Sequence, residues 1–318
     1  MLKLLHKKIL LSIGLAAIIY LAFIIYADYQ KIILSFSRFN WWLMPVLLIL
    51  SLGNYFTRFL KWQYYLKLIK VSLKMLDSLA IFLSGLVMSV TPGKMGELLK
   101  SYLVKQVNST PVSKTAPIIF AERITDFLAL TLLSVLGAHY FNYGKIIAIV
   151  ILGVILIGII ILTNRKIFEI IIRFALKISF MKKHVLKMQN IYDSSSTLLS
   201  FFPLMTMTAL SAFSWGLEGI GYYIVISNFN SGFNLIWSLF SYSFATIVGA
   251  VSMLPGGLGV TEGSLTLMSV QQGLSQNDAT ASTFIIRVVT LWFAVLIGAI
   301  GLIFYQKKFG KDISFEND

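Results

Sequence analysis

The stretch that decides the fold is "SVTPGKMGELLKSYLVK", residues 89–105, where a Pro-Gly pair, a glutamate and three lysines interrupt an apolar region. The chain around it has 318 residues, of which 57% are hydrophobic and 13% are charged, and its mean hydropathy is +0.82. A soluble domain carries about 25% charged residues. The composition therefore predicts an all-α polytopic membrane protein, with one transmembrane domain over residues 1–318.

Apolar segments long enough to cross a bilayer, which takes about 20 residues, recur along the chain. They are residues 9–26, 41–57, 116–140, 145–163, 203–227 and 279–305. Two more apolar stretches, 79–106 and 236–272, carry a Pro-Gly break between two arms. Non-helical backbone at membrane depth survives only inside protein or beside a water-filled cavity. We therefore expect six spanning helices plus two re-entrant helical hairpins, although each broken stretch could instead be two full crossings.

The distribution of basic residues predicts which side of the membrane each loop faces. Lysine and arginine crowd residues 3–8, 58–74, 94–114, 165–187 and 307–311, whereas 141–144, 227–235 and 271–278 have none. Residues 27–40 carry one of each and are a weak exception. Since cytoplasmic loops are enriched in Lys and Arg, both termini should be cytoplasmic in a multi-pass protein of the cell (plasma) membrane. The first hairpin then enters from the cytoplasm and the second from outside.

The basic stretch between the two halves has a helical pattern of its own. Arg165, Glu169, Arg173 and Lys177 recur every four residues, with Ile, Phe and Leu between them. This spacing predicts an amphipathic cytoplasmic connector over about 165–190 that lies along the inner leaflet. The alternative is a basic connector without a membrane-surface role.

The two broken stretches resemble each other. "TPGKMGELLKSYL" (91–103) is echoed by "LPGGLGVTEGSLTL" (254–267). Glu97 follows Pro92 by five residues, and Glu262 follows Pro255 by seven. The next spanning segment of each copy carries an arginine, 31 residues after the first proline and 32 after the second. The halves, about 41–140 and 203–305, therefore predict an inverted-topology repeat, as in many secondary transporters.

The polar residues inside the apolar regions are candidates for binding an anion. A half-helix that starts at Pro92-Gly93 presents free N–H groups, and we expect Lys94 and Lys100 to add positive charge there. The glycines of the second hairpin allow the backbone to approach a ligand. The candidate set for substrate binding or gating is Pro92, Gly93, Lys94, Gly96, Glu97, Glu122, Arg123, Asp126, Glu218, Pro255, Gly256, Gly257, Gly259, Glu262 and Arg287.

Two interpretations of these charges stay open. A charged side chain costs about 2.5–3.5 kcal/mol at the centre of a membrane helix, so charged residues should face the interior and pair. They either form a path that receives a phosphate and carries a proton, or they form structural pairs, Glu97 with Arg123 and Glu262 with Arg287. The aromatic residues Trp41, Trp42, Trp62, Tyr64 and Tyr65 are interpreted as an interfacial belt.

Other classes of function lack their motifs. The chain has no cysteine and three scattered histidines, so neither thiol chemistry nor a metal cluster is expected. It has no nucleotide-binding P-loop, and its net charge of +14 follows the loops between apolar segments, which does not favour nucleic acid. We expect no cofactor and no catalytic residue.

Three motifs together, "PGKMGELLKSYLV", "AERITDFLAL" and "LPGGLGVTEGSLTL", resemble the transmembrane region of lysylphosphatidylglycerol synthases, a flippase-like family. The resemblance covers about residues 10–305 and implies that the membrane part moves lipid across the bilayer. Full synthases add a soluble aminoacyl-transferase domain, whereas only "QKKFGKDISFEND" follows the last span here. The resemblance matches every candidate position above except Lys94 and Glu218.

The function expected from these observations is a flippase or scramblase that moves a phosphate-bearing lipid, such as a phospholipid or a polyprenyl phosphate. We expect no enzymatic activity. The alternatives are a membrane-embedded lipid-phosphate transferase, with Glu122 and Asp126 as acid and base, and a non-catalytic partner of a glycosyltransferase or synthase. The expected partners are anionic membrane lipids, with a homo-oligomer or a separately encoded lipid-modifying enzyme also considered.

Overall fold

The computed structural model describes residues 29–92, 95–141, 145–177, 185–230 and 232–310, and the regular structure in these ranges is helical. The predicted span 9–26 lies outside the described residues. The α-helices are α2 (Tyr29–Arg38), α3 (Met44–Leu68), α4 (Met75–Leu86), α5 (Leu99–Asn108), α6 (Val112–Phe141), α7 (Lys145–Thr163), α8 (Arg165–Lys177), α10 (Val185–Leu198), α11 (Phe201–Phe229), α12 (Leu235–Val251), α13 (Val260–Gln271), α14 (Gln276–Arg287) and α15 (Phe293–Phe309).

Three helical stretches in the described residues are long and apolar enough to cross a membrane: Trp41–Leu68, Phe201–Phe229 and Gln276–Phe309. They contain the predicted spans 41–57, 203–227 and 279–305. The stretch from Gln276 to Phe309 runs through α14, a π-helical turn at Val288–Trp292 and α15. The predicted segments 116–140 and 145–163 are also helical, within α6 and α7.

The first long helix extends further than predicted. Residues 58–74 were expected to be a basic cytoplasmic segment, but α3 continues to Leu68, and Arg58 and Lys61 are only 9% and 2% exposed. Two aromatic residues of the same turns, Trp62 and Tyr65, are fully buried, so the belt interpretation is wrong for them. Trp41 and Trp42 are exposed, as an interfacial belt requires.

Both Pro-Gly stretches form helix–break–helix hairpins. In the first, α4 and a short 3-10 turn end at Val90, and the chain resumes helically at Met95–Leu98 and continues into α5. In the second, α12 ends at Val251 and α13 begins at Val260. The two breaks meet, because Pro92 and Pro255 form an antiparallel backbone bridge.

The break of the second hairpin needs glycine for its backbone shape. Gly256 and Gly257 have φ of +61° and +66°, a left-handed conformation that costs any residue with a Cβ. At Gly257 a Cβ would also lie 2.7 Å from the hydroxyl of Thr261. The turn between α12 and α13 therefore favours glycine at both positions.

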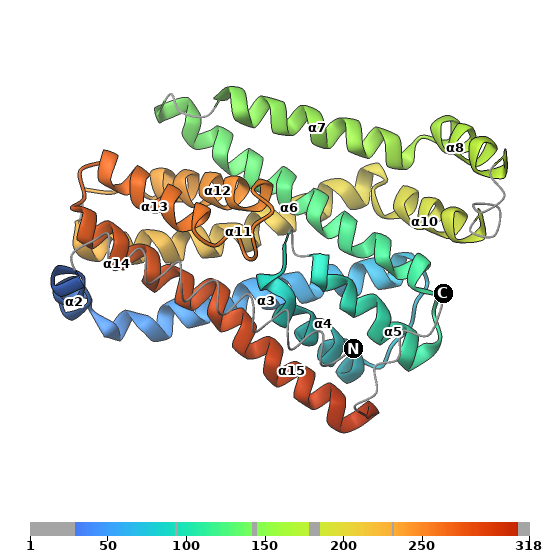
Figure 1. Ribbon diagram of the computed structural model, residues 1–318, viewed down its shortest axis with the longest axis horizontal. Coiled ribbons are helices and arrows are strands. Elements are labelled where there is room, and N and C mark those ends of the chain that lie inside the picture. Colours follow the sequence, from blue (N-terminus) through green and yellow to red (C-terminus); the bar gives the residue numbers. More distant parts are fainter. Residues whose placement is uncertain (1–28, 93–94, 142–144, 178–184, 231, 311–318) are drawn as a thin grey trace.

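Each hairpin has both of its ends at the same end of the helix bundle, and the two hairpins occupy opposite ends (Figure 1). For the first hairpin, the side chain of Asn108 donates a hydrogen bond to the carbonyl of Ser72, across the two outer ends of its arms, at 3.3 Å. Both breaks lie in the middle of the bundle.

The loops at the two ends of the bundle are held by polar contacts. At the end that holds α2, the backbone N–H of Asn40 donates to Asn228, and Ser35 donates to Asp278, which joins segments 27–40, 227–235 and 271–278. At the other end, Lys308 pairs with Asp77 at 2.6 Å. The described parts of these three segments thus lie together at the end of the bundle opposite Lys308.

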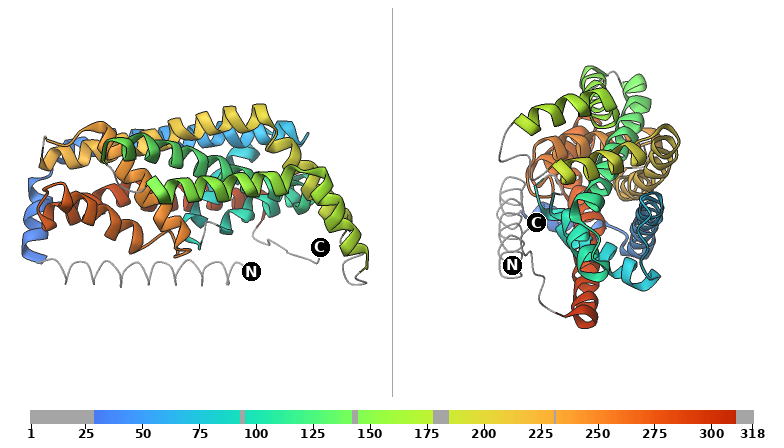
Figure 2. Two further views of the ribbon diagram at one scale, coloured as in Figure 1. Left: turned by 90° about the horizontal axis from the view of Figure 1, so that it is seen from above. Right: turned by 90° about the vertical axis from the view of Figure 1, so that its right-hand side faces the viewer.

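Close packing joins the first hairpin to the last helix. A Cβ at Gly298 of α15 would lie 2.1 Å from the backbone N of Val87, so glycine lets the two backbones touch. On the opposite side of the bundle lie α7 and α8 (Figures 1 and 2). In α8 the apolar side chains of Ile170 and Ile171 are exposed, which fits the predicted amphipathic connector.

Candidate functional site: a buried charge cluster beside a cavity

Seven charged side chains from α3, the first hairpin and α6 form one buried network. We call it the first-hairpin charge cluster; it consists of Arg58, Lys61, Glu97, Lys100, Glu122, Arg123 and Asp126. Even the most exposed of these side chains, Arg123, is only 16% exposed. Buried ions must be paired, and here four cations face three carboxylates.

Glu97 is the acceptor that links the cluster to the hairpin. It lies in the short helical turn after the Pro-Gly break and accepts from Arg58 at 3.4 Å and Arg123 at 3.3 Å, with Lys100 at 3.5 Å. These distances are long for charge-assisted hydrogen bonds, which are about 2.7–2.9 Å. One carboxylate therefore holds cations from three different elements, each at the edge of hydrogen-bond range.

The other pairs of the cluster are shorter. Lys61 contacts Asp126 at 2.9 Å and donates to Ser211 of α11 at 2.6 Å. Lys100 contacts Glu122 at 2.6 Å, and its ammonium lies 4.8 Å above the ring of Trp62. Lys100 was expected to add charge at the half-helix end, but these contacts hold it in the protein core.

The second hairpin has a smaller set of contacts around one arginine. Arg287 donates to Glu262 at 2.6 Å and to the carbonyl of Gly256 at 2.7 Å. Glu262 also accepts from the backbone N–H of Gly259 at 2.7 Å, which caps the start of α13. Arg287 therefore ties both the break and the following helix of this hairpin to α14.

The structural pairing, one of the two interpretations that the sequence left open, is present at both hairpins. Glu97 pairs with Arg123, and Glu262 pairs with Arg287, so each hairpin carries a glutamate that contacts the arginine of its next long helix. The first copy differs because Arg58 and Lys100 share its glutamate.

A cavity of about 300 Å³ lies between the two hairpins and is lined by residues of both breaks. Its polar wall includes Arg58, Arg123, Arg287, Asp126 and Glu218. Glu218 accepts a hydrogen bond from the hydroxyl of Tyr242, which also lines the cavity, at 2.6 Å.

The remaining wall of the cavity is apolar and reaches the protein surface. Phe120 and Met253 line it and are 45% and 57% exposed, and Leu254 beside them is also exposed. The cavity thus combines a charged interior with exposed apolar residues in its wall.

The predicted site residues separate into groups in the structure. Those that line the cavity are Arg123, Asp126, Glu218, Gly256, Gly257 and Arg287. Glu97 and Glu262 lie behind its wall and pair with Arg123 and Arg287, whereas Glu122 pairs with Lys100 and Gly259 donates its N–H to Glu262. Pro92, Gly96 and Pro255 belong to the breaks, where Gly96 donates its N–H to Thr91 at 2.9 Å, while Gly93 and Lys94 lie outside the described residues.

Sequence reasoning missed two cations of this site, Arg58 and Lys61. Both were assigned to a cytoplasmic basic stretch, because hydropathy ends a span at the first charges. The available signal was the apolar and aromatic pattern that continues after them, "FLKWQYYLKL" at 59–68, which permits a longer helix.

Comparison with known proteins identifies the family of this chain. A family described as "Lysylphosphatidylglycerol synthase TM region" matches residues 9–298. The chain belongs to this family. The resemblance found in the three motifs is thereby confirmed, and the chain is a membrane protein.

Relatives of this family member are similar over most of their length. A UPF0104 membrane protein of Methanocaldococcus jannaschii is 25% identical over 229 residues, which are 70% of this chain and 96% of the relative. A UPF0104 membrane protein of Methanothermobacter thermautotrophicus is 22% identical over 288 residues, which are 83% of this chain and 85% of the relative. One of Pyrococcus horikoshii is 22% identical over 268 residues, 76% of this chain and 80% of the relative.

Proposed function

We propose that the protein is a lipid translocase of the flippase or scramblase type, without enzymatic activity, in the cell membrane. The cargo is a phosphate-bearing lipid whose head group crosses between the two hairpin breaks. The observation that carries this proposal is the cavity between the hairpins, which has three arginines inside and exposed apolar residues at its opening.

The arginines of the cavity suit a phosphate. A guanidinium has five N–H donors in a plane that matches two phosphate oxygens. Arg58 and Arg123 both line the cavity, and their contacts with Glu97 are long, at 3.4 Å and 3.3 Å. A phosphate in the cavity would take these donors in exchange for the weak contacts with Glu97.

The size of the cavity favours transport of the head group alone. A volume of about 300 Å³ is at the lower end of small-molecule sites, which span about 300–1,000 Å³. The lipid tails would remain in the bilayer and pass the apolar opening at Phe120 and Met253. Because the charged head group stays among polar side chains and does not enter hydrocarbon, the free-energy cost of its crossing is lower.

The topology that we propose is an inverted repeat with two re-entrant hairpins and cytoplasmic termini. It is supported by the meeting of Pro92 with Pro255 and by the position of each hairpin's ends at one end of the bundle (Figure 1). In such folds a site between broken helices opens to either side by movement of one repeat against the other.

The test is head-group movement in liposomes that contain the purified protein. Fluorescent phosphatidylglycerol and a labelled polyprenyl phosphate are compared, with and without a proton gradient. Arg58→Gln and Arg123→Gln should each slow movement roughly tenfold or more, since charged hydrogen bonds contribute about 1.5–3 kcal/mol. Lys308→Gln is the matched control, because that side chain is 41% exposed and lies near the end of α15, outside the cavity lining.

Each outcome decides between the proposed function and its alternatives. Transport that is lost in folded Arg58 and Arg123 variants and kept in the Lys308 variant supports passage through the cavity. Equal transport by all three variants would refute the cavity as the path. No movement of either lipid by the unaltered protein would refute translocation and favour a transferase or a partner role.

A further inference from the structure

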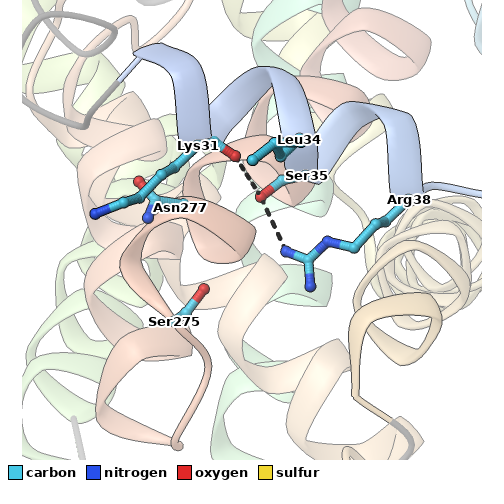
Figure 3. Close-up of a pocket in the computed structure, with 6 residues that line it drawn as sticks. All are labelled: Lys31, Leu34, Ser35, Arg38, Ser275 and Asn277. Carbon is cyan, nitrogen blue, oxygen red and sulfur yellow. Dashed lines mark hydrogen bonds between the residues drawn. The ribbon is translucent and has the colours of Figure 1, made fainter.

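A second cavity lies apart from the hairpins, at the end of the bundle that holds α2. It has a volume of about 270 Å³ and is lined by Lys31, Leu34, Ser35 and Arg38 of α2, with Ser275 and Asn277 at the start of α14. Figure 3 shows the α2 side chains facing Ser275 and Asn277. None of these residues lines the cavity between the hairpins.

Two cationic side chains line the cavity. Lys31 and Arg38 are seven residues apart, which is two helical turns, so they lie on one face of α2. The nearby carboxylate, Asp278, is buried below them and accepts from Ser35 at 2.7 Å, from Ser275 at 2.8 Å and from Arg38.

The contacts of Asp278 also fix the shape of the cavity. They join α2 to the start of α14, and Arg38 donates in addition to Ser35 at 3.4 Å. The guanidinium is therefore held at the rim, with its side chain still 62% exposed. A group that enters the cavity meets a positioned guanidinium, an ammonium, a hydroxyl and an amide.

The position of α2 indicates what reaches this cavity. Beside the polar face, Ile33 and Leu34 are 62% and 60% exposed, and Trp41 and Trp42 at the same end of the bundle are exposed too. An amphipathic helix with exposed apolar residues lies in the membrane surface, and tryptophan is enriched at that depth. Lipid phosphates lie at the same level.

We propose that this α2–α14 cavity binds the phosphate of an anionic lipid head group from the adjacent leaflet. Lys31 and Arg38 contact the phosphate, the amide of Asn277 donates to its oxygens or to the glycerol, and the acyl chains lie along Ile33 and Leu34. By the charge rule this leaflet is the outer one. The site is separate from the proposed transport path and does not depend on translocation.

The test is site-specific crosslinking in nanodiscs. Benzoylphenylalanine at Leu34 is irradiated in discs of phosphatidylcholine with increasing phosphatidylglycerol, and crosslinked lipid is identified by mass spectrometry. We expect saturable crosslinks to phosphatidylglycerol. Lys31→Glu should raise the phosphatidylglycerol fraction needed for half-maximal crosslinking at least tenfold, because it replaces one of the two cations with a carboxylate and leaves the contact of Arg38 with Asp278 in place.

The controls separate this site from others. Lys67→Glu, an exposed cation at the opposite end of α3, and Arg123→Gln in the central cavity should leave the crosslink unchanged. Equal crosslinking of phosphatidylcholine and phosphatidylglycerol, or no effect of Lys31→Glu, would overturn the proposal. Complete displacement by millimolar inorganic phosphate would also overturn it, since a free anion would then be the ligand.

Discussion

Glu262→Gln is expected to destabilise the protein by about 3–5 kcal/mol, the cost of breaking a buried ion pair on one side. The glutamine can still accept from the N–H of Gly259, so the cap of α13 is kept and the charge alone is removed. Arg287, 7% exposed, would then be a buried cation that keeps its bond to the carbonyl of Gly256 but loses its 2.6 Å contact with the carboxylate.

Arg287→Gln should cost about 1 kcal/mol more than Glu262→Gln, because the carbonyl of Gly256 also loses its donor. The double variant should cost about 2–3 kcal/mol less than the sum of the two, since neither buried charge is then left alone. The measurement is reversible unfolding in mixed detergent micelles, with helix content as the readout. The reasoning is refuted if the costs of the two single variants add up to the cost of the double variant within about 0.5 kcal/mol. A cost below about 1 kcal/mol for Glu262→Gln would also refute it.

Further predictions concern packing and the bundle surface. Gly298→Ala should destabilise the protein by about 1–3 kcal/mol, because the new Cβ would lie 2.1 Å from the backbone N of Val87. The control is Gly153→Ala, where a Cβ would meet no atom within 4 Å, and it should not destabilise the protein in the same unfolding assay. Lys308→Gln should change the unfolding free energy by no more than about 1 kcal/mol, since its contact with Asp77 is partly exposed; a loss above about 2 kcal/mol would contradict this.

The buried cations of α3 show how a membrane helix can carry charge. Arg58 and Lys61 would be costly in hydrocarbon, at about 2.5–3.5 kcal/mol each near a helix centre. Both face the bundle, where Glu97 and Asp126 compensate them. The partners come from the first hairpin and from α6, so the long α3 is stable only when these elements are packed against it.

The same dependence explains why the cavity has its charges where it does. Lys61 holds Asp126 and Ser211 together, which joins α3, α6 and α11 around one ammonium. Arg123 then contacts both Glu97 and Asp126 and also lines the cavity. The polar wall is thus a product of several helices, and no single motif contains it.

The sequence by itself determined the membrane class and the two Pro-Gly breaks, and it offered the glutamate–arginine pairs at 97/123 and 262/287 as one of two interpretations. These depend on composition and on local patterns: apolar length, residues that cannot continue a helix, and the same polar spacing repeated in two halves. Such signals lie within one stretch of chain, which is why they could be found without a structure.

Only the tertiary structure decided the length of α3, the burial of Lys100 against Trp62 and the meeting of Pro92 with Pro255. Whether a charge ends a helix or lies buried inside the bundle depends on whether pairing with an opposite charge offsets the free-energy cost of burying it. The partner of Arg58 is 39 residues away, and that of Lys61 is 65 residues away. Local pattern cannot supply that information, because the compensating carboxylates arrive only when the helices pack.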